Sequence, residues 1–418
     1  MGFNRAPATI VSYLSRSEEW LTCNREKLLT GAIWFLVLLG APRLSYQLWR
    51  LLFKDGGNGA NDLRLLYRWV ARWFEGDSFY GYIILPATFP TLWPITGWLS
   101  LQATRWLWLA LYVIAFWAFV RILKSGACIR SGKETVLLAL FVLTIYPTGV
   151  TIGNGQMTLL LLPAIVGALM ISGEGGPSPW RQAAAIALFI FSSSKLPVTA
   201  PFFLVLIITL EGFRTMTIVG ACYLLLTFFA LHFRDMNIVE FISTWTREAP
   251  GAAAGGGHSN IYHFLGFLGN RNVLLPASGV MLAALAAWLY KFRKTDFWVQ
   301  LGVAAIVARL WTYHRLYDDL LIIIPMAVVL RLLRNGSLTG NERAAGGVIF
   351  AVSVASFQIP GFFLQLPRPW GVLFQTGQMI VWLSLLAFLT YFAYTSEKKK
   401  QPERVETTPG TSPLPREV

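Results

Sequence analysis

The sequence is poor in charged residues, and most of all in acidic ones. Only 13% of its 418 residues are charged, and 21 Asp and Glu stand against 35 Lys and Arg. Soluble domains carry roughly 25% charged residues. The deficit runs along the whole chain, in which 55% of the residues are hydrophobic. This composition argues against an ordinary soluble domain and predicts an all-α polytopic membrane protein.

Cysteine and several catalytic motifs are also scarce. The three cysteines, Cys23, Cys128 and Cys222, are far apart, which excludes a disulfide framework and a cysteine metal site. There is no zinc motif, no GxSxG and no Ser-His-Asp order. The glycine-rich stretch 250–264 lacks the GKS or GKT of a P-loop.

The net charge of +14 comes without a basic helix that carries a nucleic-acid readout motif. We therefore expect no nucleic-acid partner. Lys and Arg cluster between apolar runs instead, where they act as topology signals and contact lipid headgroups.

What the chain does have is long apolar runs, which predict about twelve transmembrane helices in a single bundle. The predicted organisation is a cytoplasmic N-terminal segment (1–28), a transmembrane domain (29–394) and a disordered, Pro-rich cytoplasmic tail (395–418). No small-residue cleavage site precedes the first run, so we expect that span to be retained. The predicted spans are 29–49, 104–123, 134–151, 156–172, 182–194, 196–211, 215–232, 273–290, 297–313, 317–333, 345–360 and 372–394.

The segment 82–101 is the difficult one, because Pro86, Pro90 and Pro94 interrupt it. We predict a short re-entrant or interfacial helix there and not a full crossing. The Lys and Arg clusters then fall on one side, which the positive-inside rule makes cytoplasmic, together with both termini. A full crossing would instead move the cluster at 121–133 outside. The protein is thus expected in the cytoplasmic (plasma) membrane.

Asp62 lies just outside the first predicted span and opens the run DLRLLYRWVARWFEG. The apolar residues of this run repeat near 3.6, and arginines spaced by four share one face, as in a helix lying at the headgroups. Two interpretations stay open: Asp62 or Asn61 caps the helix, or Asp62 is a chemically active carboxylate. The apolar positions are Leu63, Leu66, Tyr67, Val70 and Phe74, and the arginines are Arg64, Arg68 and Arg72.

Two further outer-side segments carry charge. Lys195 stands between two apolar half-spans and either snorkels from a helix end or binds a phosphate group. In YHRLYDD, His314 and Arg315 either face an anion or join Asp318 and Asp319 in an internal salt-bridge cluster. The two aspartates are also placed to cap the helix that follows.

Amides and histidines complete the outer-side list. GNGQM places Asn154 and Gln156 before a span, either as a plain turn and cap or as ligands for sugar hydroxyls. The glycine-rich stretch is expected to form a mobile lid that carries His258 and His263, with a structural role as the alternative. One carboxylate among cations and amides suits transfer of a group from a lipid-borne phosphate to a hydroxyl.

These motifs, in this order, resemble the C-fold integral-membrane glycosyltransferases that use polyprenyl-phosphate sugars. The nearest group is the polyprenol-phosphate-mannose-dependent α-1,2-mannosyltransferases of phosphatidylinositol mannoside assembly, with a more distant similarity to GPI-anchor mannosyltransferases. The resemblance runs from about residue 30 to 335. It is carried by Asp62, by RWFEGDSFY and FPTLWP, and by NGQMTLLLL, KLPVTAP and HRLYDD.

The resemblance implies an inverting glycosyltransferase with its site on the extracytoplasmic side. Asp62 matches the general base. Lys195, His314 and Arg315 match positions that hold the carrier phosphate. The remaining expected binding residues are Asn154 and Gln156, near the sugar, and His258. An Asp-x-Asp motif is replaced by Asn61-Asp62-Leu63-Arg64, and FPTLWP stands where Tyr-Pro-Pro is typical, so no divalent metal and no cofactor are expected.

The implied partners are a polyprenyl-phosphate sugar, a glycolipid or glycan acceptor and membrane lipids. Mannose is favoured by the resemblance alone; arabinose, glucose and galactose stay open, as do the acceptor, the linkage and the oligomeric state. The rival from another class is a polytopic transporter or lipid-linked sugar flippase. A polymerase or ligase of surface glycans would keep the same chemistry with another acceptor.

Overall fold

The computed structural model describes residues 8–76, 84–174, 177–210, 212–234, 236–254, 258–265 and 273–400. Every regular element in these ranges is a helix, and none is a strand. The elements are α1 (Ala8–Leu52), α2 (Asn61–Phe74), α3 (Thr88–Thr96), α4 (Leu101–Gly126), α5 (Gly132–Thr144), α6 (Tyr146–Asn154), α7 (Thr158–Ser172), α8 (Pro179–Ser192), η1 (Ser193–Lys195), α9 (Leu196–Ile208), α10 (Phe213–His232), α11 (Ile238–Ala254), α12 (Ile261–Leu265), α13 (Leu274–Lys291), α14 (Phe297–Leu310), η4 (Leu316–Ile322), α15 (Ile323–Arg334), α16 (Gly340–Gln358), η5 (Gly361–Gln365) and α17 (Trp370–Lys400).

Six helical segments of the described chain are long and apolar enough to cross a membrane, which agrees with a polytopic helical membrane protein. A seventh is added if α5 and α6, bent by 60° at their junction, form one broken span. Twelve crossings remain a prediction. The six segments are Cys23–Leu52, Leu101–Gly126, Pro179–Ile208, Phe213–His232, Leu274–Lys291 and Trp370–Lys399.

One of these six segments is sharply bent. By length and composition Pro179–Ile208 counts as one span, but Phe189 of α8 and Phe203 of α9 pack with ring centroids 5.6 Å apart. A continuous helix would separate residues 14 positions apart by about 21 Å. The helix is therefore sharply bent at η1, where Lys195 has non-helical dihedrals of φ −137° and ψ 71°. Lys195 thus lies between two short helices, as the sequence predicts.

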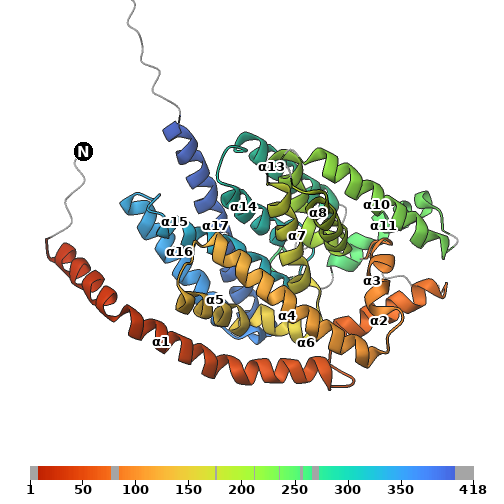
Figure 1. The fold of residues 1–418 in the computed structure, drawn as a ribbon, viewed down its shortest axis with the longest axis horizontal. Helices are drawn as coiled ribbons and strands as arrows, with labels where there is room; N and C mark the ends of the chain where they lie inside the picture. Colours follow the sequence, from red (N-terminus) through yellow and green to blue (C-terminus); the bar gives the residue numbers. More distant parts are fainter. Residues whose placement is uncertain are drawn as a thin grey trace, which may run out of the picture.

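The centre of the bundle is built from short, predominantly apolar helices. Every residue of α14 from Trp298 to Leu310 is buried, and most of α7 is buried too. The long α1 runs along the outside of the bundle (Figure 1, red), and only 11% of its most apolar window is buried. Aromatic residues of α1 such as Trp34 and Phe35 are exposed, as expected for a helix that faces lipid.

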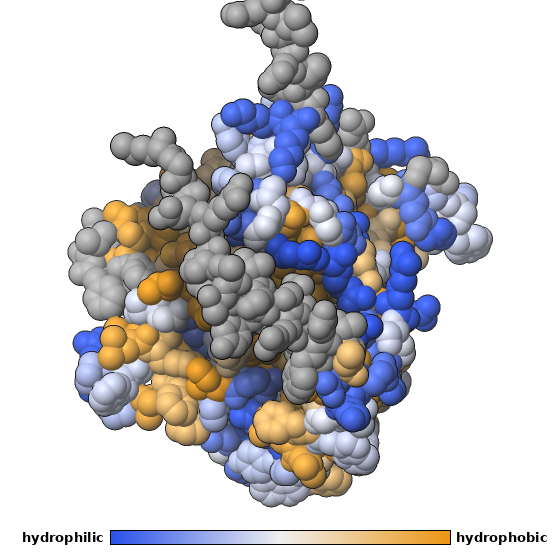
Figure 2. All heavy atoms as spheres, turned by 90° about the vertical axis from the view of Figure 1, so that its left-hand side faces the viewer, coloured by the Kyte–Doolittle hydropathy of each residue, from blue (hydrophilic) through white to orange (hydrophobic). Residues whose placement is uncertain are grey.

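One end of the bundle, on the left-hand side of Figure 1, holds ion pairs between helices. Figure 2 faces this end and shows hydrophilic residues (blue) spread over much of it beside hydrophobic ones (orange). Ion pairs there join three helices: Glu134 of α5 contacts Arg25 of α1 at 2.5 Å and Arg334 of α15 at 3.1 Å. Arg25 and Arg334 belong to the basic clusters that the sequence assigns to the cytoplasmic side.

Two short helices follow α1, in line with the interfacial helices predicted there. α2 buries Leu63, Leu66, Val70 and Trp73 and exposes Arg68. Of the residues in the predicted apolar face, Tyr67 and Phe74 are only half-buried. Trp73, which was not part of the predicted face, is buried instead.

α3 has nine residues, or about 14 Å of helix, which is too short for a crossing. Trp73 stacks on Phe89 of α3 with ring centroids 4.1 Å apart, which fixes the two helices against each other. Residues 82–83 of the predicted re-entrant segment lie outside the described residues.

The predicted tail needs one correction. Residues 395–400 continue helix α17 and do not begin a disordered segment, while 401–418 lie outside the described residues. At the other end α1 begins at Ala8, so the polar segment before the first predicted span is helical from that residue.

Candidate functional site

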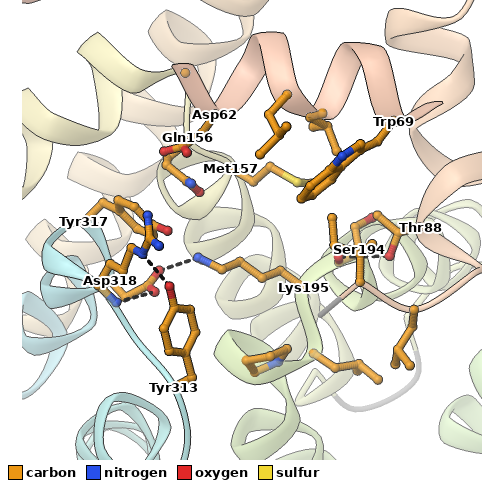
Figure 3. A pocket seen from close by; sticks show the side chains of 18 of the residues that line it. Asp62, Trp69, Thr88, Gln156, Met157, Ser194, Lys195, Tyr313, Tyr317 and Asp318 are labelled. Carbon is orange, nitrogen blue, oxygen red and sulfur yellow. Dashed lines mark hydrogen bonds and ion pairs between the residues drawn. The ribbon is translucent and has the colours of Figure 1, made fainter. Parts of the chain in front are cut away.

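A cavity of about 200 Å³ lies where α2, the α6–α7 junction, the α8–α9 turn and the start of η4 meet. Four of the seven site residues proposed from the sequence line it: Asp62, Gln156, Lys195 and Arg315. Figure 3 shows Asp62 and Gln156 together on one side and the Lys195 side chain reaching across towards Asp318. The rest of the wall is largely apolar, with Leu65, Leu66, Trp69, Ile84 and Leu85 among its residues.

Asp62 reaches the cavity from the first turn of α2. The helix is capped by Ala60, which has a left-handed conformation with φ 42° and makes no side-chain cap. The hypothesis that Asp62 or Asn61 is the N-cap is therefore wrong. The Ala60 amide instead donates to the Gly153 carbonyl at 3.1 Å, which ties α2 to the end of α6. An acidic group in the first turn still interacts favourably with the helix dipole.

The Asp62 carboxyl is held in a protein environment that disfavours its charge. Burial raises its pKa above the ordinary value, while a hydrogen bond from Gln156 and the positive charges of Arg315 and Lys195 oppose that rise. Its Oδ2 atom is buried and has no hydrogen-bond partner within the described chain. A buried acceptor without a partner is costly, so this oxygen is available to a hydroxyl group that enters the cavity.

Gly155 explains why the two amides of GNGQM point to different places. It ends α6 with φ 72°, and a Cβ there would lie 2.4 Å from Cβ of Leu63 in α2. The reversal sends Gln156 to the cavity, whereas Asn154 accepts a hydrogen bond at 2.6 Å from Arg50 and does not line the cavity. The expectation that Asn154 faces the sugar is not met in this structure.

Lys195 projects from the α8–α9 turn into the cavity. Its Nζ lies 2.6 Å from Oδ1 of Asp318, 3.2 Å from the Thr158 hydroxyl and 4.6 Å from the centre of the Tyr317 ring. The side chain is 21% exposed, so it does not snorkel to a surface. An ion-paired lysine next to a cavity holds a positive charge in place for an anion that approaches.

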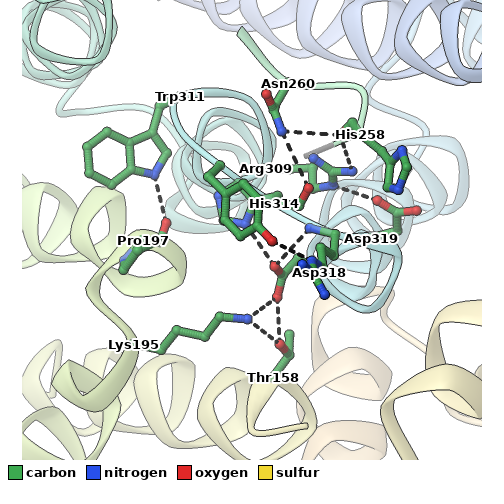
Figure 4. A network of polar contacts seen from close by, with 12 residues as sticks. Thr158, Lys195, Pro197, His258, Asn260, Arg309, Trp311, His314, Asp318 and Asp319 are labelled. Carbon is green, nitrogen blue, oxygen red and sulfur yellow. Dashed lines mark hydrogen bonds and ion pairs between the residues drawn. The ribbon is translucent and has the colours of Figure 1, made fainter. Parts of the chain in front are cut away.

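His314 does not line the cavity. It is fully buried, and its Nδ1 lies 3.0 Å from Oδ2 of Asp318 (Figure 4). Burial lowers the pKa of His314 to about 4, so the ring is neutral at pH 7. The predicted contact of His314 with a carrier phosphate is replaced by the alternative internal cluster, in which the ring orients Asp318.

Arg315 is the cation that faces the cavity without an acidic partner. Within the described ranges no Asp or Glu oxygen lies within the 4.0 Å that defines an ion pair with it. Its Nε donates to the Tyr313 hydroxyl, and its backbone N–H donates to Asp318 at 3.4 Å. Asp318 therefore caps η4 as predicted, and Arg315 is left to bind an anion.

His258 lies on the far side of His314, away from the cavity. Its backbone N–H donates to the His314 carbonyl at 3.0 Å, and its ring Nδ1 is 3.3 Å from the side-chain amide of Gln375. His258 is therefore placed as a structural residue, the alternative that the sequence left open. The side chain of His263 lies outside the described residues.

Sequence reasoning missed a buried network behind the site. Arg309 of α14 pairs with Asp319 at 2.5 Å, both about 1% exposed, and also donates to the His258 carbonyl at 2.9 Å. The Tyr146 hydroxyl donates to the same carboxylate. An arginine inside a predicted span was the available signal, because ionisable groups there are rarely without a role. Asp319 thus supports the site and does not cap a helix.

Comparisons with protein-family models, with curated proteins and with solved structures found no significant match for this chain. In the part of the chain that the structure describes, no group of three or more His, Cys, Asp or Glu is placed to hold a metal ion. The chemistry of the site is therefore argued from its geometry.

Proposed function

We propose that the protein is an inverting glycosyltransferase that moves a hexose from a polyprenyl-phosphate sugar to a hydroxyl of a glycolipid or glycan acceptor at the extracytoplasmic side. Mannose is the sugar that the sequence resemblance favours. The observation that carries the proposal is one cavity in which Asp62, a half-buried carboxylate whose Oδ2 has no hydrogen-bond partner among the described residues, faces two cations, Lys195 and Arg315.

In the proposed reaction Asp62 accepts the proton of the acceptor hydroxyl. The hydroxyl oxygen forms a bond to C1 of the sugar, and the bond from C1 to the phosphate oxygen breaks with inversion. The phosphate keeps the electron pair, and Arg315 and Lys195 stabilise its negative charge. A phosphate leaving group needs little protonation, so one carboxylate suffices where a glycosidase uses two.

The two cations have different roles in this scheme. Lys195 is already paired with Asp318 at 2.6 Å, so a bound phosphate shares it. Arg315 has no such pair and presents a planar group suited to two phosphate oxygens. The apolar wall formed by Leu65, Leu66, Trp69, Ile84 and Leu85 is suited to the first isoprene units of the carrier.

The cavity's position argues against the rival transporter or flippase. Transporters hold substrates near the bilayer midplane, at breaks between half-helices. Here Asp62 lies in the first turn of α2, Gln156 lies between α6 and α7, and Lys195 lies at the bend between α8 and α9. The polar groups therefore gather at helix ends.

The test is a reconstituted assay with purified protein, a polyprenyl-phosphate mannose and a glycolipid acceptor. We expect labelled sugar to move to the acceptor and the product anomer to be inverted. The same vesicles are assayed for movement of the labelled lipid between leaflets. Lipid movement without sugar transfer would replace this proposal with the rival.

A further inference from the structure

A second cavity, of about 380 Å³, lies between α1, the bend from α5 to α6, and η5. α6 and η4 separate it from the first cavity. Neighbouring residues of η4 illustrate this, because Leu316 lines the second cavity while Tyr317 lines the first. Nothing in the proposed reaction uses the second cavity.

The charged residue of this cavity is Arg43, which lies within the candidate span Cys23–Leu52, nine residues before its end. Its guanidinium donates one hydrogen bond, at 2.9 Å, to the Thr144 carbonyl that the α5–α6 bend leaves free. No carboxylate in the described chain forms an ion pair with Arg43. An arginine has five N–H donors, so most of them stay available.

The position of Arg43 makes an unused guanidinium costly. Ionisable side chains within a span pair with one another, bind backbone carbonyls or face a polar cavity. One carbonyl satisfies only part of this group. An anion in the adjoining cavity would supply both the missing charge and the missing acceptors.

The opening of the second cavity is lined by aromatic side chains, in contrast to its charged interior. Tyr46 and Phe362 line it and are 51% and 61% exposed. α1 is the least buried of the candidate spans, so its outer side faces lipid. The cavity therefore combines a half-buried cation with exposed aromatic rings at the membrane side, which matches a phosphate headgroup joined to acyl chains.

We infer that this second cavity binds the phosphate of an anionic membrane lipid through Arg43, with the acyl chains lying against Tyr46 and Phe362. The inference does not rest on the proposed glycosyl transfer. It concerns a different cavity, and lipid binding is measured without any sugar donor.

The test measures phosphatidylglycerol binding to the purified full-length protein in neutral detergent, by native mass spectrometry and by the shift in melting temperature. Wild-type protein is expected to retain the lipid and to melt at a higher temperature when it is added. Arg43→Gln is expected to bind it about tenfold more weakly, the loss typical of one charge-assisted contact. Arg68→Gln, which removes an exposed arginine of α2, is the matched control and should bind as wild type does.

A second variant keeps Arg43 and fills the space. A Cβ at Gly149 would meet Gln47 at an ordinary 3.5 Å, so Gly149→Leu should fold with its side chain in the cavity and lose the lipid. Equal binding by wild type, Arg43→Gln and Gly149→Leu would overturn the inference. It would also be overturned if inorganic phosphate stabilised wild type as strongly as the lipid, or if phosphatidylcholine bound as well as phosphatidylglycerol.

Discussion

Asp62 lies in a position that disfavours its negative charge. Burial raises its pKa, and neither Gln156 nor the nearby cations fully offset that effect. A carboxylate kept in such a place contributes to function at a cost in stability. A purely structural acid would have partners that stabilise its negative charge. Asp318 is such a residue, because it contacts a lysine, a threonine and a histidine.

The first prediction concerns stability. The raised pKa means that the folded state binds the Asp62 proton more tightly than the unfolded state. The contribution of Asp62 is therefore most favourable below its ordinary pKa and is lost as pH rises through the folded-state pKa. Asp62→Asn should melt at the same or a higher temperature than wild type at pH 7, with the difference vanishing at low pH. A lower melting temperature at pH 7 would mean that the carboxylate is a structural group.

The second prediction concerns the pH dependence of transfer. A general base must be unprotonated, so the rate should rise with pH through the Asp62 pKa and then level off. The positive charge of Arg315 lowers that pKa, so Arg315→Gln should move the rise to higher pH and weaken donor binding. Arg68→Gln is the control and should leave the rise where it is. An unshifted pH profile in Arg315→Gln would mean that the charge of Arg315 does not lower the pKa of Asp62.

At the scale of elements, the position of the α8–α9 turn could be predicted from the sequence. The acidic residue that Lys195 contacts could not. The Lys-Pro break between apolar half-spans predicts an interruption at Lys195, and the packing of Phe189 against Phe203 shows a sharp bend there. Two separate crossings remain a prediction. Lys195 and Asp318 are 123 residues apart, however, and only tertiary packing decides which carboxylate the lysine meets. A glycine likewise decides which of the two amides faces the cavity. The turn at Gly155 directs Gln156 towards the cavity and Asn154 away from it.

The third prediction tests the buried pair that holds η4. Arg309 and Asp319 link α14 to η4, and Arg309 also lies 4.6 Å from the Trp382 ring of α17. Arg309→Met leaves Asp319 buried without its cation and should cost about 3–5 kcal/mol in stability. Arg309→Met combined with Asp319→Asn should recover much of that loss in the same unfolding experiment. A small loss in the single variant would show that the pair is not coupled to folding.

At the scale of the whole molecule, composition predicted the helical membrane class, and the fold agrees. The number of crossings is harder to predict, because short buried helices such as α7 and α14 have 15 and 14 residues and are completed by their neighbours. Apolar length alone would merge α8 with α9, and only their packing separates them. Likewise, the first cavity assembles from five distant segments, which no local pattern shows.

The fourth prediction tests the topology by cysteine labelling in whole cells. In a variant without Cys23, Cys128 and Cys222, single cysteines replace Ser178 before α8 and Thr215 at the start of α10. Because the sequence predicts two crossings, 182–194 and 196–211, both sites should react from the cytoplasmic side only. Asn58→Cys, in the loop between α1 and α2, is the control and should react from outside. Labelling of the cysteines at positions 178 and 215 from opposite sides would mean that the segment Pro179–Ile208 crosses the membrane once.

The most direct test of the central claim is the turnover of Asp62→Asn with a polyprenyl-phosphate sugar and an acceptor. The variant keeps the shape of the side chain and removes the base. We predict that turnover falls by about 10²–10⁴-fold while donor binding stays close to that of wild type, because Arg315 and Lys195 are intact. Near-normal turnover in Asp62→Asn would contradict the assignment of Asp62 as the catalytic base.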